Sequence, residues 1–127
     1  MTCKVLIVDD SKLARMSVVK VLRTLHSDWK RIEAANAAEA LELTKELSPD
    51  VALVDFNMPG KDGVTLAGEL RALNPRIAVA VISANRQVNV IDRTQTAGAA
   101  FLPKPLTESA LAEFLDAARR QREKEPK

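Results

Sequence analysis

Polar side chains stand directly after several short apolar segments of this sequence. Four of them are Asp9, Asp10, Asp55 and Ser83, and a lysine, Lys104, follows the last such segment. Carboxylates held a few ångströms apart repel one another unless a cation joins them. Oxygen ligands with no second cysteine and a single histidine in the chain favour a hard ion. If the fold gathers these groups, they predict a Mg²⁺ site.

The elements that would position these residues alternate along the chain. Short apolar runs predict strands at residues 5–8, 30–35 (a weaker edge strand), 51–54, 77–82 and 99–103. Helical stripes predict helices at residues 14–25, 36–47, 66–73 and 87–96, with a last one after Thr107. Five strand–helix alternations indicate an α/β domain with a parallel sheet. The continuous apolar runs indicate central strands that are covered on both faces.

One edge of such a sheet would collect the polar residues. The carboxyl ends of parallel strands meet at the same edge, and ligands bind in the crevice there. The alternative is that strand-end aspartates only cap helices, with Asp10 capping a helix that begins at Ser11. That simpler interpretation suits any one residue, but the five together favour a site.

Length and composition limit the function further. The 127 residues suit one domain, and a net charge of +2 is too small to indicate direct nucleic-acid binding. The longest apolar run is residues 77–82, so we expect no membrane span, and the amino terminus lacks signal-peptide features. The single cysteine, Cys3, fits a reducing cytoplasm. We expect a domain at residues 1–122 and a charged, disordered tail or linker at 123–127.

Four segments also carry a resemblance to a known family. "LIVDDS", "VDFNMPGKDG", "VISA" and "FLPKPL" resemble the motifs of response-regulator receiver domains, the phosphoacceptors of two-component signalling, and the resemblance covers residues 3–120. It implies a flavodoxin-like, doubly wound fold with a five-stranded parallel sheet in the order 2-1-3-4-5 and five helices on both faces.

The resemblance also implies roles at the sheet edge. Asp55 would accept a phosphoryl group from a histidine kinase or a histidine phosphotransfer domain. Asp10, Asp55 and the backbone carbonyl of Asn57 would bind Mg²⁺, with Asp9 acting through a water molecule. Lys104 would contact the phosphoryl oxygens, and a cis peptide before Pro105 would direct its ammonium inward.

A switch would then follow phosphorylation. Ser83, the other contact of the phosphoryl oxygens, would be pulled toward the new group, and Phe101 would rotate into the vacated space. The face made by the fourth helix, the fifth strand and the fifth helix would change for a phosphorylation-dependent target. Phe101 as plain core is the alternative. Asn57 and Asn85 would tune slow self-dephosphorylation, so the chain would catalyse only its own phosphorylation and dephosphorylation.

Leu13 and Met16 lie off the core stripe of the first helix. They are either scattered surface hydrophobics or a docking patch for the phosphodonor near the acidic edge. The sequence leaves open whether the protein is a monomer or a phosphorylation-dependent dimer.

Three other functions are weighed against a stand-alone receiver. A receiver cut from a larger regulator would have its output domain elsewhere. A flavin carrier of the same fold would need a hydroxyl- and glycine-rich loop after the first strand, where this chain has Asp9 and Asp10. A Mg²⁺-dependent phosphatase would resemble Asp-x-Asp at its nucleophile, whereas residue 57 is asparagine.

Overall fold

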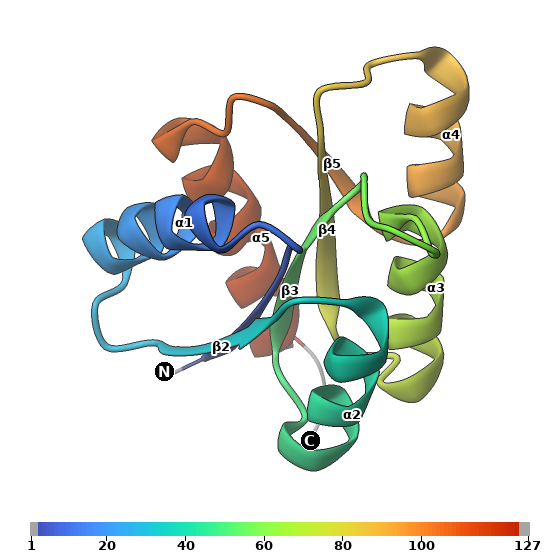
Figure 1. Ribbon diagram of the computed structural model, residues 1–127. Coiled ribbons are helices and arrows are strands. Elements are labelled where there is room, and N and C mark those ends of the chain that lie inside the picture. Colours follow the sequence, from blue (N-terminus) through green and yellow to red (C-terminus); the bar gives the residue numbers. More distant parts are fainter. Residues whose placement is uncertain (1–2, 125–127) are drawn as a thin grey trace.

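The computed structural model of the protein describes residues 3–124, and side chains through residue 121. Five strands and five helices alternate within that range (Figure 1). The strands are β1 (Lys4–Val8), β2 (Lys30–Ala34), β3 (Val51–Asp55), β4 (Ala78–Ser83) and β5 (Ala100–Pro103). The helices are α1 (Lys12–Leu25), α2 (Ala37–Leu47), α3 (Gly63–Leu73), α4 (Val88–Thr96) and α5 (Glu108–Lys124).

The strands form one parallel sheet in the order β2-β1-β3-β4-β5, which confirms the predicted fold. Helices α1 and α5 cover one face, and α2, α3 and α4 cover the other (Figure 1). Side chains of each strand alternate between the two faces. Because helices bury both faces, β1 and β3 are apolar along nearly their whole length.

Two hydrophobic clusters hold these layers together. The α1/α5 cluster packs helix residues such as Leu22, Leu111 and Leu115 on the sheet, and the opposite cluster packs Leu66 and Leu70 of α3. All five side chains are fully buried. Cys3 is also buried within the α1/α5 cluster. Since each cluster needs strands from both halves of the chain, the sheet edge is assembled only when the whole domain folds.

Several helix ends follow the predicted signals. The Asn36 side chain accepts a hydrogen bond from the Glu39 N–H at 2.8 Å and caps α2. The Thr107 hydroxyl accepts from the Ala110 N–H at 3.1 Å, in the first turn of α5. The alternative interpretation, in which Asp10 caps the first helix, is wrong, because Ser11 caps α1 through the Ala14 N–H. Asp10 is therefore left for another role.

The last helix is longer than expected. Helix α5 continues through Lys124, so the predicted tail boundary at residue 122 falls inside it. Arginine, glutamate and lysine are good helix formers, which explains why a charged sequence extends the helix. Residues 125–127 of the predicted tail lie outside the described residues.

At the amino end of β2, Trp29 is 4% exposed. Its ring stacks on that of His26, with centroids 3.8 Å apart and planes 6° apart. This pair closes the turn between α1 and β2, at the edge of the sheet opposite the strand ends that carry the acidic residues. Within residues 3–124, no helix combines the length and the apolar character needed to cross a membrane.

Candidate metal and phosphate site

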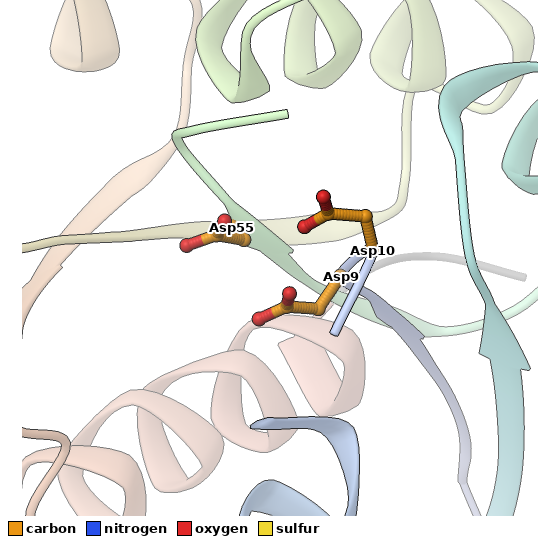
Figure 2. A group of neighbouring side chains, drawn as sticks. All are labelled: Asp9, Asp10 and Asp55. Carbon is orange, nitrogen blue, oxygen red and sulfur yellow. The ribbon is translucent and has the colours of Figure 1, made fainter. Parts of the chain in front are cut away.

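The three predicted carboxylates meet at the carboxyl edge of the sheet. One ligand oxygen each from Asp9, Asp10 and Asp55 can be chosen so that all lie within 4.8 Å of one another. Figure 2 shows the three side chains extending in the same direction from the ends of β1 and β3. Asp9 and Asp55 are buried and Asp10 is exposed, so the group opens to solvent on one side.

The β1–α1 turn fixes Asp9. Its N–H donates to the Ala34 carbonyl at 3.1 Å, and its Oδ1 accepts from the Ser11 N–H at 2.9 Å. Burial raises the pKa of Asp9, the Ser11 hydrogen bond opposes that rise, and the charges of Asp55 and Asp10 reinforce it. The turn therefore holds a carboxylate where ionisation is unfavourable without a cation.

Within the described residues, the Oδ1 atom of Asp55 has a charge partner but no directed hydrogen bond. Its side chain is 7% exposed, and its Oδ1 lies 2.6 Å from Lys104 Nζ. The direction of this approach does not meet hydrogen-bond geometry, so within the described residues Oδ1 is a buried oxygen without a hydrogen-bond donor. The contact is an ion pair, and a second cation that prefers oxygen ligands would suit this atom.

Ser83 and Lys104 come to this edge on neighbouring strands. Ser83 is buried at the end of β4 and pairs with Pro103 of β5. The Lys104 N–H donates to the Ser83 carbonyl at 2.9 Å, and the Ser83 hydroxyl oxygen accepts from the Asn85 N–H at 2.9 Å. The Lys104–Pro105 peptide is cis, as predicted. The backbone hydrogen bond between Lys104 and Ser83 thus holds the residue with the hydroxyl beside the residue with the ammonium.

The remaining predicted residues lie on the loops after β3 and β4 and on β5. Asn57 is exposed in the loop after β3, and Asn85 is half-buried, with its Oδ1 accepting from the Gln87 N–H at 3.0 Å. Phe101 is half-buried and lies opposite Val81 in the β4–β5 register, on the face that carries α4.

Leu13 and Met16 form an exposed apolar patch on α1. Leu13 is 76% exposed and Met16 is 55% exposed. They line an open cavity of about 670 Å³, together with Ser17, Val19, Lys20, Arg23 and Glu33. A second cavity of about 260 Å³ lies between α1 and the loop before α5, and Asp9, Asp55 and Lys104 contribute to its wall.

Two residues at the site were not predicted from the sequence. Arg15 donates from Nη1 to the Asp9 carbonyl at 2.6 Å. Gly63, the first residue of α3, packs so closely on the end of β3 that a Cβ there would clash with the Asp55 carbonyl oxygen and lie 2.9 Å from Phe56 Cα. Gly63 has two sequence signals: it directly follows Asp62, the cap of α3, and it ends the quoted segment VDFNMPGKDG. For Arg15, the residue type alone indicates only a solvated helix face.

Comparisons with known proteins agree with this geometry. The family model for the response regulator receiver domain matches residues 5–116. The chain is 32% identical over 118 residues to the chemotaxis protein CheY of Bacillus subtilis, across 91% of this chain and 97% of that protein. It is 37% identical to the probable transcriptional regulatory protein NarL of Mycobacterium tuberculosis, across 91% of this chain but 55% of that protein.

Solved structures give the same result. The signal receiver domain of NarL from Mycobacterium tuberculosis superimposes with a TM-score of 0.81 at 35% identity, covering 93% of this chain and 97% of that one. A CheY-like receiver domain protein from Methanospirillum hungatei superimposes with a TM-score of 0.88, covering 98% of this chain and 100% of that one. At 23% identity, the second likeness concerns the fold alone.

Proposed function

This chain belongs to the response regulator receiver domain family, and from that membership we propose that it is a phosphoacceptor in which Asp55 takes the phosphoryl group. The observation that carries the proposal is the position of Asp55. It is a buried carboxylate gathered with Asp9 and Asp10 and paired at 2.6 Å with the Lys104 ammonium. A nucleophile, an acidic metal-binding group and a cation for phosphoryl oxygens therefore share one edge of the sheet.

The donor set fits Mg²⁺. All of the candidate ligands are oxygens, and the buried Asp55 Oδ1 has no directed hydrogen bond among the described residues. The side chains of Asp10 and Asp55 and the backbone carbonyl of Asn57 would hold the ion, with Asp9 acting through water. When bound, the ion would neutralise charge on the carboxylates and on the incoming phosphoryl oxygens.

The transfer itself needs position and charge neutralisation. A carboxylate oxygen of Asp55 forms the new P–O bond as the P–N bond of a partner's phosphohistidine breaks. The Lys104 ammonium, already 2.6 Å from Asp55 Oδ1, stabilises the negative charge on the transferred group. The Ser83 hydroxyl, whose oxygen accepts from Asn85, retains its own proton to donate to a phosphoryl oxygen.

The switch would operate through the face formed by α4, β5 and α5. Ser83 moves toward the phosphoryl group as a donor, and Phe101 rotates into the space that it leaves. Three features of this region support the proposal. Phe101 is only half-buried, and α4 begins without a side-chain cap, with Val88 73% exposed. A helix held by few fully buried side chains can shift between two arrangements of similar free energy.

The proposed chemistry is limited to the chain's own phosphorylation and slow dephosphorylation. Asn57, exposed beside the site, and Asn85, on the loop after β4, would tune the access of the attacking water. The partners would be a histidine kinase or phosphotransfer domain and a target that recognises the phosphorylated face.

The exposed patch of Leu13 and Met16 would dock the phosphodonor, because it lies on α1 close to the acidic edge and lines an open cavity. Leu13→Glu combined with Met16→Glu should slow transfer from the cognate donor while leaving labelling by acetyl phosphate unchanged. Leu47→Glu, on α2 at the other face of the sheet, is the control and should leave both rates unchanged. Equal loss of both reactions in the double variant would refute docking.

A second candidate is the receiver part of a larger regulator. The chain spans 55% of the regulator NarL that it matches, and 97% of the chemotaxis protein CheY, so relatives of both lengths exist. The coding sequence beyond Lys127 decides between them.

Intact mass measured after incubation with Mg²⁺ and acetyl phosphate tests the central proposal. The wild-type protein should gain one phosphoryl group, and Asp55→Asn or added EDTA should abolish the gain. The control Asp28→Asn changes an exposed carboxylate elsewhere and should label normally. Label that persists in Asp55→Asn would overturn the assignment of Asp55.

A further inference from the structure

Arg15 is a largely buried cation beside the acidic cluster. Its side chain is 14% exposed. Nη1 donates to the Asp9 carbonyl at 2.6 Å, and Nε donates to Glu33 Oε1 at 3.0 Å. One guanidinium on α1 thus joins the end of β1 to β2. None of the proposed steps of phosphoryl transfer uses this residue.

The contact bears on both neighbouring carboxylates. The Asp9 carbonyl belongs to the peptide that links Asp9 to Asp10, so fixing that oxygen fixes the plane of the peptide. The Asp9 N–H and side chain have their own partners, Ala34 and Ser11. Arg15 is the partner of the remaining polar group of Asp9, its carbonyl oxygen. Its planar guanidinium presents two donors at a fixed separation, and Glu33 anchors the far side.

We propose that Arg15 is a positioning residue for divalent-cation binding: anchored by Glu33, it holds the Asp9–Asp10 peptide so that Asp10 faces Asp55. This inference rests on the proposed magnesium site. Groups that orient metal ligands through hydrogen bonds often change metal affinity by about 10-fold or more when they are removed.

The charge of Arg15 and its role in orienting the peptide predict opposite changes in Mg²⁺ affinity when Arg15 is removed. A positive charge next to three carboxylates repels an incoming cation, so its removal alone should strengthen Mg²⁺ binding. Loss of the peptide's orientation should weaken binding. The sign of the change therefore separates a positioning role from a simple charge effect.

Isothermal titration calorimetry with Mg²⁺ tests the inference on the metal-free protein. We expect Arg15→Ala to weaken binding by about 10-fold. Arg15→Lys keeps the charge, but a single ammonium replaces the two-donor fork, so we expect it to weaken binding as well. Arg23→Ala removes the same charge from an exposed position of the same helix and should leave affinity within about twofold. Unchanged or tighter binding by Arg15→Ala, or wild-type affinity in Arg15→Lys, would overturn the proposal.

A second pair of variants tests the anchor without touching α1. Glu33→Ala and Glu33→Gln remove the same charge, but glutamine keeps an oxygen that can accept from Arg15 Nε. We expect weaker Mg²⁺ binding in Glu33→Ala than in Glu33→Gln, and equal affinities would contradict the anchoring role. Melting temperatures without metal identify a variant that loses only stability. Wild-type protein that binds no Mg²⁺ would overturn the magnesium site itself, whereas failure in the variants alone concerns Arg15.

Discussion

Ionised Asp9 works against the stability of the metal-free fold. Burial raises its pKa, so the folded protein binds a proton at this carboxylate more tightly than the unfolded chain does. The stability that this proton contributes is present below the ordinary pKa of 3.8, and it is lost as pH rises through the higher folded value. The proposed magnesium site would use the ionised form of Asp9.

Replacing Asp9 by asparagine should therefore stabilise the metal-free protein at neutral pH, by about 0.5–2 kcal/mol. The amide oxygen can still accept from the Ser11 N–H, so the turn keeps its hydrogen bond. Calorimetric melting in EDTA measures the gain, and the same scan with Mg²⁺ should show a smaller metal-induced shift than in wild type. Asp28→Asn is the control for charge alone, and a lower melting temperature for Asp9→Asn in EDTA would contradict the argument.

The sequence predicted the site residues that are recognisable from their side-chain type and their place at the end of a strand. It did not predict the residues that matter through a contact with a backbone atom. Asp9, Asp10 and Asp55 could be assigned to one edge because parallel strands end together. Arg15 acts through a carbonyl oxygen, which any residue carries, so no side-chain pattern indicates it. The same holds for Gly63, whose requirement comes from the Asp55 backbone.

The start of helix α3 packs closely against the end of β3, the strand that carries Asp55. The Gly63 N–H donates to the Phe56 carbonyl at 2.9 Å, and the missing Cβ allows the helix to approach Asp55. The element boundaries were predicted well where apolar runs end at polar residues. The start of α3 could not be predicted in the same way, because its position depends on this close approach.

Glycine-to-alanine substitutions at two positions of α3 should change the free energy of unfolding in opposite directions. Gly63→Ala places a methyl group against backbone atoms that cannot move away, so we expect a loss of about 1–3 kcal/mol in the free energy of unfolding. Gly68→Ala meets nothing within 4 Å on an exposed helical position and should add about 0.5–1 kcal/mol. Urea denaturation of the pair measures both. If Gly63→Ala were as stable as Gly68→Ala, the close approach would not constrain the helix.

Asp62 links α3 to α4. Its Oδ1 accepts from the Thr65 N–H at 2.8 Å, and its Oδ2 accepts from Arg93 Nη2 at 3.0 Å. Burial alone would raise the pKa of Asp62, but the hydrogen bonds from Thr65 and Arg93 outweigh it, so the pKa lies below its ordinary value. The charge thus stabilises the fold above pH 3.8, and this contribution is lost as pH falls through the lower folded value.

Asp62→Asn should consequently be less stable than wild type at neutral pH, by about 0.2–1 kcal/mol because the ion pair with Arg93 is partly exposed. Asparagine still caps the helix, so the difference reports the charge. Denaturation at a series of pH values should show the two proteins converging as pH falls below 3.8. A difference that stays constant across that range would contradict the assigned pKa shift.

For the whole molecule, the acidic cluster exists only in the folded state. Asp9 and Asp10 follow β1 and Asp55 ends β3, and these two strands become neighbours when the sheet forms. A cation bound there stabilises the folded protein by mass action, since the unfolded chain cannot gather the same oxygens.

We therefore expect Mg²⁺ to raise the melting temperature in proportion to the logarithm of its concentration. At a Mg²⁺ concentration of about 100 times the dissociation constant, the gain in the free energy of unfolding should approach 2.7 kcal/mol. Asp10→Asn should lose most of it, whereas Asp28→Asn should keep it. Differential scanning calorimetry measures the series, and the absence of any shift at millimolar metal would contradict the magnesium site.

The stacked rings of His26 and Trp29 have a consequence for optical measurements on this protein. Trp29 is the sole tryptophan, so all indole fluorescence originates at the amino end of β2. The five residues of β2 place that fluorophore about 16 Å along the strand from the carboxyl edge. Its emission will report loss of the native state and remain nearly silent when a cation or phosphate arrives. Ligand titrations on this chain require an extrinsic dye or calorimetry.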